Sequence, residues 1–118
     1  LDAAFAPDWR DNTLPAGRPP GLAGMKLAIQ LLRGAVPDLR CAVEDRIVED
    51  GRLSVRITFT GTHRGAFLGH PPTGNPVRFI AFDIHRLEGG RIVESWHLED
   101  NLTVLGQFGM VQMLPAPG

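Results

Sequence analysis

Apolar residues recur at two different periods along the chain, and each period predicts a different kind of secondary structure. Between residues 22 and 35, apolar side chains stand three or four positions apart, at Leu22, Met25, Ile29 and Leu32. This spacing is typical of an amphipathic helix with one apolar side. We therefore expect residues 22–35 to form a helix that covers a sheet.

From Arg40 onward the pattern becomes extended, and residues 52–63 alternate strictly, with Leu53, Val55, Ile57 and Phe59 on one side, which indicates strands. The pairs Asp50-Gly51 and Gly89-Gly90 are turn signals that join these strands into antiparallel hairpins. The predicted strands span residues 40–50, 52–63, 76–88 and 91–100, and a short closing helix spans residues 102–109.

The N-terminal segment, "LDAAFAP", resembles the last turns of a helix that Pro7 stops, and a loop rich in Pro and Gly follows. Because the sequence starts at Leu1 rather than Met, we expect an N-terminal helix to be truncated. Helices followed by consecutive antiparallel strands predict an α+β fold, with helices on one face of a curved sheet. Residues 1–118 would form a single domain, and the sheet could enclose a cavity.

The hairpin of residues 76–100 places ionisable residues among large apolar ones. If Gly89-Gly90 lies in a three-residue loop, Asp83 stands opposite His97 with Cβ atoms ~5 Å apart, whereas a two-residue loop pairs Asp83 with Trp96. We favour the three-residue loop because it separates apolar from ionisable side chains. One face then carries Ile80, Phe82, Ile84, Ile92, Trp96 and Leu98, and the other carries Asp83, His85, Ser95, His97 and Glu99.

A carboxylate beside an imidazole in a partly dry pocket is a recognisable acid/base unit. The alternative for Asp83 and His97 is a cross-strand ion pair on a solvated face, worth ~0.2–1 kcal/mol and without catalytic role. Spacing leaves both interpretations open. The opposite, apolar face predicts a homodimer or higher homo-oligomer built on Ile80, Phe82, Ile84 and Trp96.

Composition narrows the classes of ligand and compartment. Twelve basic and thirteen acidic residues give a net charge of -1, so no general field attracts nucleic acid or anionic lipid. A single cysteine, Cys41, and the lack of a long apolar run indicate a cytoplasmic protein. The four histidines lack the spacing of a metal site, so we expect no metal.

Four motifs, "GTHRG", "LGHPPTG", "GRIVE" and "LGQFG", occur in this order. With them, the chain from about Pro7 to Gly109 resembles the SnoaL-like polyketide cyclases, also called ester cyclases, of the nuclear transport factor 2-like superfamily. The resemblance implies a cone-shaped curved antiparallel sheet around helices and a cavity. It also implies aldol-type ring closure of a carbonyl-rich, apolar, polyketide-like substrate, as in antibiotic biosynthesis, without metal or organic cofactor.

The family's acid/base residues are a His in the third strand, an Asp in the fourth and an Asn after the first helix. These positions fall at Asp83, His97 and Asp11, so carboxylate and imidazole have exchanged strands and the Asn is an Asp. We expect His97, held by Asp83, to remove a proton α to a carbonyl, and the dyad or Asp11 to protonate the product. The proposed substrate-binding residues are Trp9, His63, Phe67, Phe79 and His85.

Other interpretations stay open. Each proposed aromatic binding residue could simply belong to the core, and His63 could anchor a loop by a hydrogen bond. The fold also hosts non-catalytic ligand-binding and assembly modules, and the same pocket chemistry serves isomerases, dehydratases and hydroxylases.

Overall fold

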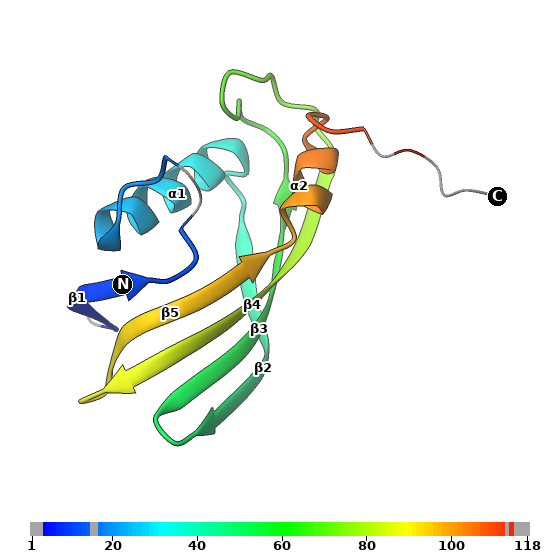
Figure 1. Ribbon diagram of the computed structural model, residues 1–118. Helices are drawn as coiled ribbons and strands as arrows, with labels where there is room; N and C mark the ends of the chain where they lie inside the picture. Colours follow the sequence, from blue (N-terminus) through cyan, green and yellow to red (C-terminus); the bar gives the residue numbers. More distant parts are fainter. Residues whose placement is uncertain (1–3, 15–16, 113, 115–118) are drawn as a thin grey trace.

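The computed structural model describes residues 4–14, 17–112 and 114, and within them the chain forms five strands and two helices (Figure 1). In chain order these are β1 (Phe5–Asp11), α1 (Gly21–Ala35), β2 (Arg40–Glu49), β3 (Arg52–Thr62), β4 (Pro76–Glu88), β5 (Arg91–Glu99) and α2 (Asn101–Gln107). The predicted helices and the four predicted strands are confirmed, with ends that differ by one or two residues.

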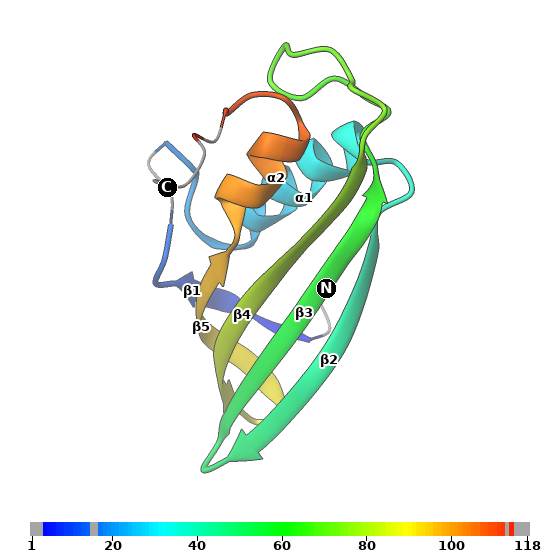
Figure 2. The same cartoon turned by 90° about the vertical axis from the view of Figure 1, so that its right-hand side faces the viewer.

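The strands form one curved, unclosed sheet in the order β1-β5-β4-β3-β2. Strands β2 to β5 pair antiparallel, and β1 adds to the edge of β5 in parallel. Both helices lie on the same side of the sheet, as the two views show (Figures 1 and 2). The predicted α+β class is confirmed, and we call the helix-bearing side of the sheet the inner face.

The interpretation of residues 1–7 as a helix end is wrong for Phe5 to Pro7, which belong to β1; residues 1–3 lie outside the described part of the chain. Strand β1 pairs Phe5 with Ile92 and Asp11 with Ser95. Local sequence favours a helix here, but pairing with β5 decides the structure. Proline is tolerated because β1 is an edge strand, on which a missing N–H need not break the sheet.

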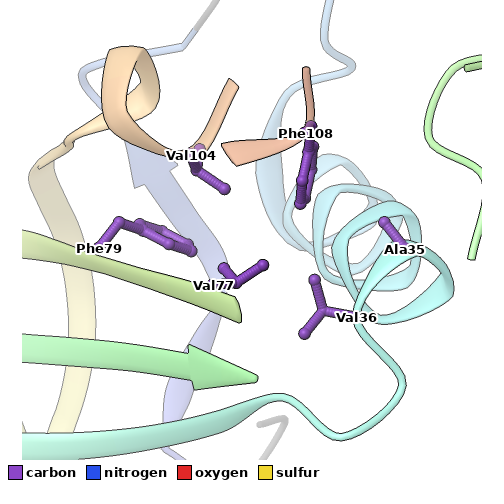
Figure 3. Close-up of a cluster of buried hydrophobic side chains, with 6 residues drawn as sticks. All are labelled: Ala35, Val36, Val77, Phe79, Val104 and Phe108. Atoms are coloured by element: carbon purple, nitrogen blue, oxygen red, sulfur yellow. The ribbon is translucent and has the colours of Figure 1, made fainter. Parts of the chain in front are cut away.

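The apolar core lies between the inner face and the helices at one end of the sheet (Figure 3). Gly65 lies so close to α1 that a Cβ there would overlap the carbonyl of Gly34. This close approach explains the second glycine of the "GTHRG" motif. The core is made of Ala35, Val36, Val77, Phe79, Val104 and Phe108. Because Val77 and Phe79 point to the helices, alternate residues of β4 after them share the inner face.

The hairpin of β4 and β5 has the predicted register at its centre, with Asp83 opposite His97, but not the predicted loop. Glu88 pairs with Arg91, so Gly89 and Gly90 form a two-residue turn, with φ of 57° and 77°. A β-bulge between Arg86 and Leu87 absorbs one residue of β5 and restores the register. It also pairs Ile92 with Leu87, which moves Ile92 from the predicted apolar face to the inner face.

Candidate functional site

Polar side chains gather in the middle of the inner face, beyond the apolar core. Alternation along β4 and β5 brings Asp83 and His85 beside Ser95, His97 and Glu99. The end of β1 lies next to β5 and adds Asp11. These side chains are largely buried: 3% of the side chain is exposed for Asp11, 13% for His97 and 19% for Asp83.

His97 is held on both ring nitrogens. Its Nε2 lies 2.9 Å from both carboxylate oxygens of Asp11, and its Nδ1 lies 2.6 Å from Oε1 of Glu99. The hydrogen bond with Glu99, followed by that with Asp11, outweighs burial and raises the pKa of His97 to about 9. At neutral pH the ring is therefore an imidazolium that donates both protons.

Asp11 is fixed from two sides. The backbone N–H and the hydroxyl of Thr13 both donate to its Oδ1, at 3.0 and 3.1 Å, and the same hydroxyl accepts from the backbone N–H of His97. Burial opposes ionisation, but hydrogen bonds from His97 and Thr13 hold the pKa of Asp11 below its ordinary value. Asp11 thus joins the site as a carboxylate at neutral pH.

Asp83 differs from the other two carboxylates of the cluster. Its Oδ2 lies 3.6 Å from Nε2 of His85, and its buried Oδ1 has no hydrogen-bond partner among the described residues. Burial, helped by the charges of Glu99 and Asp11 and opposed by His97, raises the pKa of Asp83 to about 6. Asp83 is therefore a carboxyl group that can both take and give a proton near neutral pH.

The two residues predicted to hold each other thus face each other but have other partners. The ring nitrogens of His97 are engaged by Asp11 and Glu99, so Asp83 does not orient His97 as expected. The physical reason is the added strand β1, which carries Asp11 to the ring. Sequence reasoning placed Glu99 on the correct face but gave it no role, although its position two residues from His97 was the available signal.

The other predicted site residues divide into two groups. Trp9 and His85 lie at the polar cluster, because the hydroxyl of Ser95 accepts from Trp9 Nε1 at 2.9 Å and lies 2.6 Å from His85 Nδ1. Phe79 shares the inner face and stacks on Phe59, with ring centroids 4.9 Å apart.

His63 and Phe67 are placed elsewhere, against Phe108 of the core. The ring of His63 is fully buried, stacks on Phe108 at 4.2 Å and accepts from the backbone N–H of Thr73 at 3.1 Å. This hydrogen bond ties the end of β3 to the "PPTG" loop, as the loop-anchoring interpretation of His63 predicts.

Two shallow hollows, of about 220 and 370 Å³, lie over β2, β3 and β4, with Phe82 or Ile84 in their walls, and neither is lined by Asp11, Asp83 or His97. No cluster of three potential metal ligands forms within the described residues. In that same part of the chain, the helices are too short and too polar to cross a membrane.

Comparisons with known proteins agree with this architecture. The profile of the family described as SnoaL-like polyketide cyclase matches residues 1–108. A candidate polyketide cyclase from Bacillus cereus is 39% identical, with a TM-score of 0.82, over 92% of this chain and 66% of its own. AclR from Streptomyces galilaeus, a candidate hydroxylase, is 28% identical, with a TM-score of 0.83, over 97% and 75%.

IdmH, a candidate polyketide cyclase from Streptomyces antibioticus, is 32% identical, with a TM-score of 0.78, over 92% of this chain and 84% of its own. A search of curated proteins finds no match. The fold is that of the nuclear transport factor 2-like proteins. Within that class, the chain belongs to the SnoaL-like polyketide cyclase family.

Proposed function

We propose that this protein is a cofactor-independent, polyketide-cyclase-like enzyme that closes a ring by an aldol-type reaction, with Asp83 as the group that takes and returns the proton and the His97 imidazolium as a fixed positive charge beside it. The observation that carries the proposal is the state of Asp83: a buried carboxyl group, opposite an imidazolium, with one oxygen that has no hydrogen-bond partner in the described part of the chain. An unpartnered buried carboxylate is costly to maintain, and such groups concentrate at functional sites.

In the proposed reaction, the free oxygen of Asp83 takes a proton from the carbon α to a carbonyl. The electrons of that C–H bond form an enolate, whose carbon bonds to a second carbonyl carbon of the same substrate. The π electrons of that carbonyl move to its oxygen, which then receives the proton from Asp83. One carboxyl group thus acts as base and then as acid, and no external electron donor or acceptor is needed.

His97 takes a different role from the one expected from sequence. With a pKa of about 9 it holds its protons at neutral pH, so it supplies a fixed positive charge rather than a base. That charge opposes the rise in the pKa of Asp83 and favours the negative charge of an enolate beside it. Asp11 and Glu99 fix the ring in place.

The substrate class follows from the surroundings of the site. The buried side chains of Trp9 and Phe79 lie on the same side of the sheet as the cluster. The cluster of Asp11, Asp83, Glu99 and His97 carries more negative than positive charge. A neutral, apolar, carbonyl-rich molecule of the polyketide type suits such a surface, whereas an anionic one would be repelled. Substrate-binding roles for His85, His63 and Phe67 stay predictions. His63 and Phe67 would affect the site only indirectly, through their packing against Phe108. We place the enzyme in cytoplasmic secondary metabolism.

Hydrogen–deuterium exchange tests the proton step without the natural substrate. In D2O, an aryl β-ketoester with an exchangeable α-proton is followed by NMR with wild type, Asp83→Asn and the control Asp45→Asn. Asp45 is a solvent-facing partner of Arg56. Wild type and the control should accelerate exchange equally, and Asp83→Asn should be slower by ~10²-fold or more. Equal rates for all three proteins would refute the proposal.

A second reaction, hydroxylation, is favoured by one observation, the similarity to AclR, whose description is that of a candidate hydroxylase. The two reactions differ in their use of oxygen. Consumption of O2 during turnover would support hydroxylation, and turnover at the same rate under nitrogen would support ring closure.

We also propose that the outer face of the sheet, opposite the helices, forms a homodimer. Phe82 pairs with Leu98 and Ile84 with Trp96 on this face. Phe82 is 54% exposed and Leu98 75% exposed, and Arg52 covers part of the Trp96 ring. Contiguous exposed apolar side chains of this kind mark association surfaces, and a two-fold axis lets the patch cover itself.

A further inference from the structure

A buried chain of hydrogen bonds runs from β1 through β5 to β4 behind Asp83. The indole N–H of Trp9 donates to the hydroxyl of Ser95, at 2.9 Å, and this hydroxyl lies 2.6 Å from Nδ1 of His85. All three residues are buried, and His85 and Ser95 are direct partners across the two strands. Three buried polar side chains joined in this way require a reason.

These hydrogen bonds indicate which ring nitrogen of His85 carries the proton. The Ser95 oxygen accepts from Trp9, and among the described residues His85 Nδ1 is the one acceptor within reach of its proton, so we infer that Ser95 donates in the short hydrogen bond to Nδ1. Nδ1 is then the acceptor, and the ring proton sits on Nε2. That nitrogen is the one that lies 3.6 Å from Oδ2 of Asp83.

We propose that His85 is the positioning residue for Asp83: a neutral Nε2–H donor, oriented by Ser95 and Trp9, that directs the second carboxylate oxygen toward the substrate. The inference rests on the proposed role of Asp83 in catalysis. At 3.6 Å the contact is longer than a hydrogen bond. Such contacts in a substrate-free site shorten when the substrate binds or when the carboxyl group becomes charged.

The other groups that face Asp83 show why a neutral donor is useful. Asp11 on β1 and Glu99 on β5 raise the pKa of Asp83, and His97 on β5 lowers it. On β2, burial and the negative charge of Asp83 raise the pKa of the Cys41 thiol. Burial and the nearby charge of His97 lower the pKa of His85 and keep it uncharged. His85 can thus stabilise the Asp83 carboxylate without adding a second cation.

The tautomer is directly measurable in the substrate-free wild-type protein. Nitrogen-15 NMR of the His85 ring distinguishes a protonated Nε2 from a protonated Nδ1. We expect the Nε2–H form at pH 7. The Nδ1–H form would overturn the inference whatever the enzymatic activity proves to be.

A matched pair of variants tests the effect on Asp83. His85→Gln keeps a neutral donor near the position of Nε2, and His85→Met fills the space without one. Followed by carbon-13 NMR of the Asp83 carboxyl group, the titration midpoint should rise by about half a unit to one unit in His85→Met and stay near wild type in His85→Gln.

An unchanged midpoint in both variants, or the same shift in both, would refute the positioning role and indicate a structural one. Because neither NMR measurement needs substrate, failure of the catalytic proposal is told apart by the exchange experiment with Asp83→Asn. If His85→Met does not fold, the tautomer measurement still decides.

Discussion

Asp83 and His97 stand directly opposite each other on β4 and β5, yet each ring nitrogen of His97 is bound by a carboxylate other than Asp83. This arrangement gives the two residues different chemical roles. His97 is held as a cation between Asp11 and Glu99, whereas residues 4–14, 17–112 and 114 offer no hydrogen-bond partner to one buried oxygen of Asp83. The pKa values, about 9 and about 6, follow from that division.

Asp83 should cost the protein stability at neutral pH. Its folded pKa of about 6 lies above the ordinary 3.8, so its stabilising contribution is complete below pH 3.8 and is lost as pH rises through 6. Asp83→Asn should therefore raise the free energy of unfolding at pH 8 by about 1–3 kcal/mol. Urea denaturation at pH 8 and pH 4 measures this, with Asp45→Asn as control. A variant less stable than wild type at pH 8 would contradict the burial argument.

His97 should make stability fall with rising pH in the same direction, but at a higher pH. Its folded pKa of about 9 lies above the ordinary 6.5, so the stability it contributes is complete below pH 6.5 and disappears as pH rises through 9. We expect the free energy of unfolding to fall by about 2–3 kcal/mol between pH 6.5 and pH 10, and this fall to be mostly absent in His97→Gln. The same steep decline in the variant would assign it to other groups.

Asp11 should support the charge of His97. Replacing Asp11 by Asn removes one of the two anions on the ring and leaves Glu99 in place, so the pKa of His97 should fall but stay above 6.5. Proton NMR of the His97 ring reports this midpoint. The control Asp45→Asn should leave the His97 midpoint unchanged. No change at His97 would show that the contact with Asp11 does not form in solution.

The outer face should control association. Phe82→Lys places a charge in the middle of the exposed apolar row and should convert a dimer into monomers in analytical ultracentrifugation. The control Leu31→Lys, on an exposed position of α1, should sediment like wild type. A wild-type protein that is monomeric at all concentrations would exclude the proposed interface.

Sequence patterns predicted most of the sheet because β3 alternates apolar and polar positions, and Asp50-Gly51 and Gly89-Gly90 mark the turns of the two hairpins. They also placed Asp83, His85, His97 and Glu99 on one face. They missed β1, since Pro7 and the short polar segment around Asp8 carry no strand signal of their own and pair only through long-range contact with β5.

The hydrogen bond between Asp11 and His97 could not be predicted from sequence for the same reason. Asp11 is 86 positions away along the chain, and its approach depends on the parallel pairing that sequence did not reveal. The hairpin turn shows the reverse case. The predicted register was correct although the predicted loop was not, because a bulge near Leu87 replaced the third loop residue.

The most direct test of the account is the pH dependence of α-proton exchange in the aryl β-ketoester. If Asp83 is the base, the exchange rate should rise with pH through an apparent pKa of about 6, and Asp83→Asn should lose this step. A wild-type rate that rises only through a pKa of about 9 would make His97 the base, and would contradict the assignment of proton transfer to Asp83.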